Sequence, residues 1–89
     1  MYYFYIVRCS DNSLYCGQTN DLERRIREHN SGNSRSATYT KLRRPVTLAY
    51  SESFKTIQES MKREWQVKKW TKVKKETLIK GDLDRLRKL

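Results

Sequence analysis

The sequence predicts a small α+β domain: a three-stranded antiparallel sheet flanked by helices, in the chain order β-β-α-β-α-α. Three observations support this class. Two runs rich in aromatic and β-branched residues flank a short turn cluster, two longer segments repeat apolar residues at helical spacing, and a third, alternating run lies between those segments. A chain of 89 residues supports one modest core, so we expect residues 1–89 to form a single domain.

The first two runs are predicted to form a β-hairpin. Tyr2–Cys9 has the composition of a strand, and its apolar residues fall on both faces, which is typical of a strand covered on both sides. We therefore place it at the centre of the sheet. The cluster Ser10–Ser13 is the turn, and Leu14–Gln18 is the returning strand. A hairpin is antiparallel by construction.

The spacing then becomes helical. Asn20 is expected to cap the first helix, with Glu23 completing a capping box, and Gly32 is expected to end it. The polar segment Gly32–Pro45 is predicted to be irregular, with one short helical turn near Tyr39.

The second half of the chain alternates and then becomes helical again. Val46–Glu52 is predicted to be the third strand. A long helix is expected over Phe54–Trp70, and its apolar face is predicted to hold Phe54, Ile57, Met61 and Trp65. Thr71 is expected to cap a last helix that runs through Lys80, before an amphipathic terminal turn.

The charge of the chain points to an anionic partner. Twenty Lys and Arg against ten Asp and Glu give a net charge of +10, for which nucleic acid is the first candidate and a membrane surface the second. No apolar run approaches the roughly 18 residues of a membrane span, and the N-terminus lacks the features of a signal peptide, so we expect a cytoplasmic protein. Cys9 and Cys16 are expected to be small core residues rather than a metal site or a disulfide.

Five polar side chains are candidates for a functional site, and three of them recur at regular spacing. Tyr5, Tyr15 and Arg25 lie ten residues apart, and His29 follows Arg25 by four residues, on the same helix face. Glu64 lies at the edge of the apolar stripe of the long helix. Taken singly, each has a structural explanation: strand tyrosines pack in cores, and Glu64 can pair with a lysine four residues later. The alternative partner of Glu64 is a divalent cation.

The ordered set resembles the GIY-YIG nuclease superfamily. That superfamily carries two short signatures on adjacent strands, then an arginine on the first helix and a glutamate on a later one. The signatures correspond here to YFY (Tyr3–Tyr5) and YCG (Tyr15–Gly17), the arginine to Arg25 and the glutamate to Glu64. The resemblance covers nearly the whole chain, through DLERR…H, RRPVTLAY and KKWTKVKKETLI, and points to the small stand-alone bacterial members.

The resemblance implies a metal-dependent endonuclease that hydrolyses phosphodiester bonds in DNA with low sequence specificity, in DNA repair or recombination. Glu64 would hold one Mg²⁺ or Mn²⁺ ion, because magnesium keeps several waters and also binds phosphate oxygens. Arg25 would bind the scissile phosphate, and Tyr5 would orient the attacking water or Tyr15. The general base is either Tyr15, since nearby positive charge can activate a phenol, or His29, since imidazole titrates nearer neutral pH.

This site requires a particular register between the first two strands. Both tyrosines must lie on the same sheet face, which requires an odd number of residues in the hairpin loop. We expect an odd loop, for example Asp11–Asn12–Ser13 with a bulge, which pairs Cys9 with Tyr15 and places Cys16 on the opposite face from Cys9.

The remaining cations are candidates for phosphate contacts that position nucleic acid without reading its sequence. The candidate nucleic-acid-binding residues are Arg24, Arg35, Lys41, Arg43, Arg44, Lys68, Lys69 and Lys72. Two other functions remain open. The first is a non-catalytic nucleic-acid-binding domain on the same scaffold. It is favoured because some members of the superfamily carry a late asparagine that supports the site, and this sequence has no convincing equivalent after Glu64. The second is a basic protein-interaction module. The oligomeric state is open, with a monomer favoured.

Overall fold

The computed structural model describes residues 1–32 and 35–89 and confirms the predicted fold class. Three strands, β1 (Tyr2–Arg8), β2 (Leu14–Thr19) and β3 (Thr47–Phe54), form an antiparallel sheet in the order β2-β1-β3. β1 is the central strand, as predicted. The expected segment Gly32–Pro45 includes residues 33 and 34, which lie outside the described residues.

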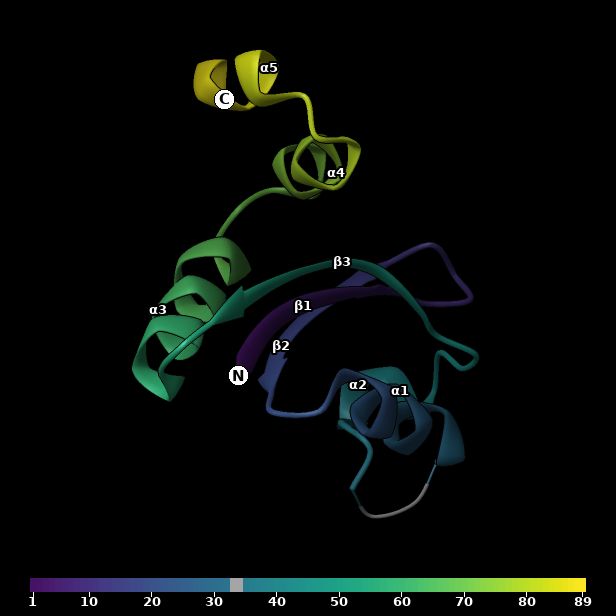
Figure 1. Ribbon diagram of the computed structural model, residues 1–89. Helices are drawn as coiled ribbons and strands as arrows, with labels where there is room; N and C mark the ends of the chain where they lie inside the picture. Colours follow the sequence, from purple (N-terminus) through teal and green to yellow (C-terminus); the bar gives the residue numbers. More distant parts are fainter. Residues whose placement is uncertain (33–34) are drawn as a thin grey trace.

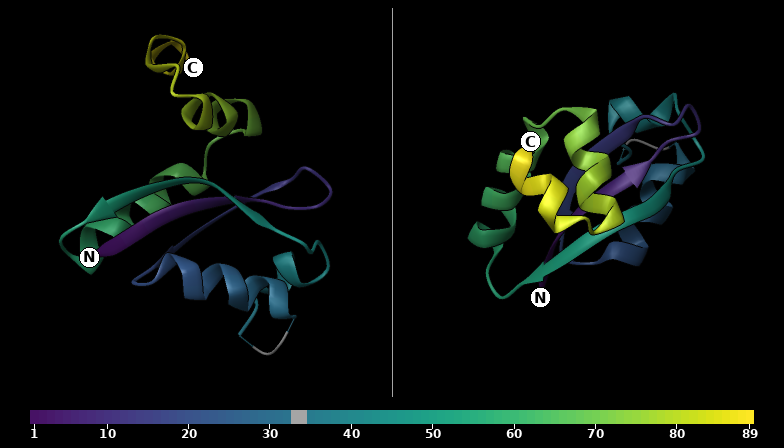
Figure 2. Two further views of the ribbon diagram at one scale, coloured as in Figure 1. Left: turned by 45° about the vertical axis from the view of Figure 1, so that its right-hand side comes forward. Right: turned by 90° about the horizontal axis from the view of Figure 1, so that it is seen from above.

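Helices cover both faces of the sheet (Figures 1 and 2). The helices of the described chain are α1 (Leu22–Ser31), α2 (Thr38–Lys41), α3 (Ile57–Lys68), α4 (Lys72–Lys80) and α5 (Leu83–Lys88). We call the side of the sheet that α1 and α2 cover the α1 face, and the side that α3 and α4 cover the α3 face. The short turn predicted near Tyr39 is α2, and the predicted amphipathic terminal turn is α5.

Alternation along β1 divides the core into two clusters. Phe4 and Ile6 point to the α3 face, where they pack with Cys16, Val67 and Leu78. The α1-face cluster contains Tyr5, Val7, Cys9 and Val46, with Tyr15, Leu22 and Ile26 packed against it. The apolar residues on both faces of the first strand therefore serve two cores. Both cysteines are free and buried, on opposite faces, as expected.

The hairpin loop has the predicted odd parity, but its register differs by one pair. Tyr5 pairs with Gly17 and Val7 pairs with Tyr15, so the two tyrosines share a face. The predicted pairing of Cys9 with Tyr15 is wrong, because the Cys9 N–H donates to the Ser13 carbonyl at 2.8 Å and closes a loop of residues 10–12. Asn12 takes a left-handed φ of 69°, which completes a common three-residue hairpin loop.

The first helix begins one residue later than expected. Asp21, rather than Asn20, is the N-cap, and its side chain accepts a hydrogen bond from the Arg24 N–H. Both residue types are good caps. Asn20 instead accepts a hydrogen bond from the Arg24 guanidinium at 2.7 Å. Gly32 ends the helix with a φ of 69°, as predicted.

The predicted boundary and buried face of the long helix are wrong. Phe54 is the last residue of β3, and α3 begins after Thr56, whose side chain caps the helix by accepting from the Glu59 N–H. The buried residues of α3 are Ser60 and Val67. Ile57, Met61 and Trp65 are instead 38%, 51% and 64% exposed. Helical spacing groups these three side chains, but it does not say on which side of the helix the sheet lies.

Helix α4 packs back toward the sheet, and α5 packs on α4 (Figure 1). Thr71 caps α4, as predicted, by accepting from the Lys74 N–H. A bidentate ion pair fixes α4 to the end of β1: the Arg8 guanidinium donates to both Glu76 oxygens at 2.6 and 2.7 Å. No helix in the described part of the chain has the length and apolar character needed to cross a membrane.

Candidate active site

Tyr5 and His29 meet beneath the sheet, on the α1 face. Tyr5 lies on the central strand and is 1% exposed, and His29 lies in the last turn of α1 and is fully buried. The Tyr5 hydroxyl is 2.8 Å from His29 Nε2. Tyr15, on the neighbouring strand, packs edge-on against the His29 ring, with the two ring centroids 5.5 Å apart. The two predicted tyrosines and the predicted histidine therefore form one group.

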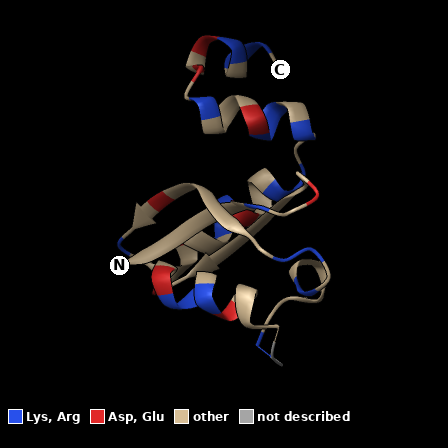
Figure 3. Cartoon of the chain, turned by 90° about the vertical axis from the view of Figure 1, so that its right-hand side faces the viewer, with Lys and Arg blue, Asp and Glu red and all other residues tan. Residues whose placement is uncertain are grey.

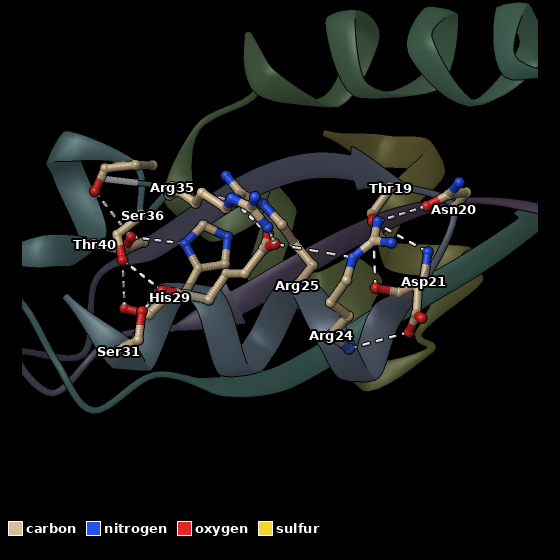
Figure 4. A network of polar contacts seen from close by, with 12 residues as sticks. Thr19, Asn20, Asp21, Arg24, Arg25, His29, Ser31, Arg35, Ser36 and Thr40 are labelled. Carbon is tan, nitrogen blue, oxygen red and sulfur yellow. Dashed lines mark hydrogen bonds and ion pairs between the residues drawn. The ribbon is translucent and has the colours of Figure 1, made fainter. Parts of the chain in front are cut away.

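A third residue fixes the direction of this hydrogen-bond chain. His29 Nδ1 is 2.7 Å from Thr40 Oγ1, a contact visible in Figure 4. The Thr40 hydroxyl donates its single proton to the Ala37 carbonyl at 3.1 Å, so toward His29 it can only accept. In this assignment of the Thr40 proton, Nδ1 carries the imidazole proton and Nε2 accepts the proton of Tyr5. The Tyr5 oxygen is left with lone pairs alone to offer to the rest of the site.

The protonation states agree with this chain. Burial raises the pKa of Tyr5 to about 12, against the opposing effect of the Arg25 guanidinium. Burial lowers the pKa of His29 to about 4, and the positive charge of Arg25 acts in the same direction. At neutral pH Tyr5 keeps its proton and His29 is uncharged.

Gly17 makes room for the Tyr5 ring. It lies opposite Tyr5 in the β1–β2 register, and a Cβ atom at this position would be 2.5 Å from Tyr5 Cζ and closer still to the hydroxyl. Real Cβ contacts are essentially never this short. The glycine of the second signature is therefore the residue that lets the phenol cross the neighbouring strand.

Arg25 is held in place beside Tyr5. Its Nη1 donates to Glu28 Oε1 at 3.0 Å and to the Arg35 carbonyl at 2.6 Å. Glu28 also lies 3.9 Å from Arg24 and 3.8 Å from Arg35, so one carboxylate contacts three arginines along α1 and the segment after it. These arginines lower the pKa of Glu28, Arg25 most strongly. The guanidinium is fixed at a site where it can bind an anion by its remaining donors.

Tyr15 is the more accessible of the two tyrosines. It is half-buried, and among the described residues its hydroxyl has no hydrogen-bond partner. Its ring stacks on Tyr39, with centroids 5.8 Å apart, and the Arg43 guanidinium covers the Tyr39 ring at 3.9 Å. Arg43 is tied down in turn by Asp11 at 3.2 Å. Tyr39 therefore connects Tyr15 to Arg43 in one stack.

Glu64 lies on α3 and acts on Tyr5 through its charge. Its side chain is 26% exposed and pairs with Lys68 at 3.9 Å, and its negative charge raises the pKa of Tyr5. Within the described residues there is no cluster of three or more His, Cys, Asp or Glu. A single, partly exposed carboxylate fits a hydrated Mg²⁺ or Mn²⁺ ion that takes its remaining ligands from water and phosphate. It does not fit a cation held by the protein alone.

The candidate nucleic-acid-binding residues fall into two groups. Arg24, Arg35, Arg43 and Lys68 contact residues of the site described above. Lys41 and Arg44 lie further along the α2 segment, where Arg44 donates to the Lys41 carbonyl. Lys69 covers the Trp65 ring, and Lys72 begins α4. Figure 3 shows that Lys and Arg also continue along α4 and α5, so the positive charge extends well beyond the tyrosines.

Sequence analysis missed two residues of this site. Thr40 and Tyr39 lie in the short helix of the polar segment, where no periodicity marks a buried or stacked side chain. The sequence did predict a helical turn near Tyr39. An ordered turn in a polar segment indicates that its side chains contact the rest of the protein.

A hollow of about 340 Å³ lies away from this group, between α4 and α5. Lys72, Glu76, Lys80 and Arg85 line it together with Val73, Thr77 and Asp82. It contains no tyrosine or histidine, and its carboxylate Glu76 is already committed to Arg8. We therefore place the candidate active site at the tyrosines and not at this hollow.

The sheet, the paired tyrosines and the helical Arg25 and Glu64 define a class of protein. The GIY-YIG catalytic domain family matches residues 1–77, and the chain belongs to this family.

Its relatives are small bacterial proteins. The chain is 51% identical over 78 residues to the UPF0213 protein YazA of Bacillus subtilis, covering 88% of this chain and 77% of that protein. It is 50% identical over 78 residues to a UPF0213 protein of Bacillus pumilus, covering 88% and 78%. The solution structure of EF2693 from E. faecalis matches with a TM-score of 0.60 at 43% identity, over 90% of this chain and 83% of that one. The UPF0213 protein BH0048 of Bacillus halodurans matches with a TM-score of 0.56 at 41% identity, over 90% and 84%.

Proposed function

We propose that this protein is an endonuclease that hydrolyses phosphodiester bonds in DNA with one Mg²⁺ or Mn²⁺ ion at Glu64. The supporting observation is that Tyr5 and Tyr15 converge on His29 while Arg25 and Glu64 both act electrostatically on the Tyr5 hydroxyl. Such a group offers a proton acceptor, a phosphate-binding cation and a metal ligand together.

Each residue has a distinct task in this proposal. Arg25 binds the non-bridging oxygens of the scissile phosphate. Tyr15, as its phenolate, accepts a proton from the attacking water and becomes the neutral phenol, while the water oxygen bonds to phosphorus and the bond to the leaving strand oxygen breaks. The bound cation would withdraw negative charge from the phosphate and stabilise the leaving oxygen. Tyr5 orients the water through its lone pairs.

Of the two candidate bases, geometry favours Tyr15. His29 is fully buried, and both of its ring nitrogens are hydrogen-bonded, whereas Tyr15 is half-buried with an uncommitted hydroxyl among the described residues. His29 and Thr40 are therefore positioning residues that set the direction of the Tyr5 hydroxyl. A role in DNA repair or recombination agrees with low sequence specificity, because dispersed lysines and arginines bind phosphates without reading bases.

Cleavage of a labelled substrate panel tests the proposal. The panel contains single strands, duplexes, flaps, branched DNA and RNA, with Mg²⁺ or Mn²⁺. We compare the wild type with Glu64→Gln and with the matched control Glu59→Gln, an exposed carboxylate on the same helix where glutamine preserves the capping box. We expect cutting by the wild type and the control, and none by Glu64→Gln.

Other outcomes would replace the proposal. Salt-sensitive binding of nucleic acid without cutting by any protein would favour a non-catalytic binding domain. Equal cutting by Glu64→Gln and the wild type would remove Glu64 from the site. The absence of any salt-dependent affinity for DNA or RNA would favour a protein-interaction module.

A further inference from the structure

Helix α3 exposes a row of large apolar side chains. Ile57, Met61 and Trp65 are 38%, 51% and 64% exposed, and they are spaced four residues apart, so they form one stripe along the helix. We call these three residues the α3 stripe. Single exposed apolar residues are ordinary on protein surfaces, but a contiguous row of them marks a contact surface.

The α3 stripe borders the candidate active site. Ser60 and Val67 form the buried face of α3, and Glu64 is four residues from one and three from the other. Glu64 is also three residues after Met61 and directly before Trp65, so it lies between the buried face and the α3 stripe. A substrate phosphate near the Glu64 carboxylate therefore has its neighbouring nucleotide within reach of the stripe.

The far end of the stripe meets the first helix. Ile57 lines a shallow hollow together with Arg24 and Asn20 of the α1 start, and with Tyr2, Gln18 and Thr19 of the sheet. Arg24 is a candidate phosphate contact whose side chain is 48% exposed. The stripe thus runs from Arg24, at the start of α1, to Lys68 and Lys69, at the end of α3.

Charge selects the kind of partner. Lys62, Lys68 and Lys69 are exposed around the stripe, and Lys69 Nζ is 3.2 Å from the centre of the Trp65 ring. Lys69 covers one face of the indole, while the 64% exposure of Trp65 leaves the other side open. An aromatic face bordered by cations suits a ligand with both a flat apolar ring and a phosphate. A nucleotide has both, and stacking on aromatic residues in a basic groove is how single strands are bound.

We propose that the α3 stripe is a subsite for an unpaired nucleotide of the substrate, whose base stacks on the open face of Trp65 and whose phosphate pairs with Lys69. A base within continuous duplex has both faces occupied by its neighbours, so the subsite selects DNA with a single-stranded segment beside the scissile bond. This inference rests on the proposed nuclease function, because it deepens the substrate class of the same site.

Binding in the absence of chemistry tests the inference. The full-length Glu64→Gln protein, without divalent cation, is titrated into a labelled oligothymidylate single strand and into a labelled blunt duplex of matched length, and anisotropy reports the affinity. Trp65→Ala should weaken single-strand binding about 5- to 100-fold, while duplex binding changes less than about twofold. Trp65→Phe should keep most of the affinity because it preserves a ring, and Leu83→Ala, an exposed apolar residue on α5, is the matched control.

Fluorescence gives a second, independent readout. In a Trp70→Phe background Trp65 is the remaining tryptophan, and stacking by the oligothymidylate should quench it, whereas the blunt duplex should not. Equal losses on both DNAs, or no loss on either, would overturn the inference. Self-association abolished by Trp65→Ala would also overturn it in favour of a second copy, and tighter binding of polyglutamate than of DNA would overturn it in favour of an acidic protein partner.

The two proposals fail separately. Because the titration uses a variant without its metal ligand, an inactive wild type leaves the stacking result intact. Conversely, metal-dependent cleavage with unchanged binding by Trp65→Ala would leave the proposed function standing without this subsite.

Discussion

The two faces of the sheet are built from alternate residues of the same strand, yet they differ in chemistry. On the α3 face Phe4 and Ile6 pack against Cys16, Val67 and Leu78, an apolar cluster. On the α1 face Tyr5 packs against His29, which is bonded to Thr40. Buried polar groups destabilise a fold unless they are hydrogen-bonded, and among the described residues every buried side-chain polar atom has a partner. The α3 face of the sheet is therefore an apolar core, whereas the α1 face holds the buried polar group of the candidate site.

The sharpest test of this contrast removes one tyrosine hydroxyl from each face. Tyr15 and Tyr50 are both half-buried, but Tyr50 belongs to the α3 face and donates to Glu52 at 2.5 Å. Tyr15→Phe should slow cleavage about 10³-fold, the size of a lost general base, which corresponds to about 4 kcal/mol in the barrier. Tyr50→Phe should stay within about twofold of the wild-type rate, because its hydroxyl is bonded to Glu52 on the opposite face of the sheet from Tyr5 and Tyr15. Equal losses of single-turnover cleavage rate in Tyr15→Phe and Tyr50→Phe would contradict the assignment of the site to the α1 face.

The second test uses pH. The pKa of buried His29 lies near 4, below the ordinary 6.5, so between these values the unfolded chain binds a proton that the native protein does not. The contribution of neutral His29 to the free energy of unfolding is therefore fully present above pH 6.5, and it should fall by about 3 kcal/mol as the pH drops toward 4. Urea unfolding across this range measures the slope. The chain has a single histidine, so His29→Gln should flatten the slope; an unchanged slope would show that other groups cause it.

The third test compares two glycines. Gly17→Ala places a methyl group against the Tyr5 ring and should destabilise the protein by about 1–3 kcal/mol as well as lower cleavage. Gly81→Ala meets no atom within 4 Å, but its φ of +76° disfavours alanine, at a cost of about 1 kcal/mol. Thermal unfolding and cleavage rates together check the pair. We expect both variants to be less stable and Gly17→Ala alone to be slower; normal cleavage by Gly17→Ala would contradict the assigned position of Tyr5.

The fourth test concerns the far end of the hydrogen-bond chain. Thr40→Val keeps the shape of the side chain but cannot accept from His29 Nδ1, and it should lower cleavage about tenfold, or about 1.4 kcal/mol. Thr40→Ser should restore the rate. Imidazole ¹⁵N chemical shifts report which nitrogen of His29 carries the proton, a property that a merely structural residue would not change. An unchanged tautomer in Thr40→Val would remove Thr40 from its positioning role.

Much of the fold follows from patterns that local physics determines. Apolar residues on both faces of Tyr2–Cys9 predicted the central strand, and the two tyrosines required an odd loop. The errors arose where neighbouring residues offer equivalent local chemistry, as with Asn20 and Asp21 as caps. The orientation of α3 could not be predicted for another reason. Periodicity gives the relative positions of side chains around a helix, whereas packing against β1 and β2 decides which of them are buried.

The candidate site divides in the same way. The spacing of Tyr5, Tyr15 and Arg25 made them visible in the sequence, because regular elements carry them. Thr40 reaches His29 from a polar segment, and such a contact has no periodic signature. Position 17 requires a glycine because it lies opposite Tyr5 in the strand register, and this register is a property of the folded hairpin.

The hairpin loop at residues 10–12 also limits how relatives of this chain can vary in length. Side chains alternate between faces, so inserting or deleting one residue between Cys9 and Ser13 would turn Tyr15 toward the apolar cluster unless a bulge compensated. A change of two residues would leave both tyrosines on the α1 face. Natural length variation at this exposed tip should therefore occur in even steps, even though loop tips otherwise tolerate insertions of any size.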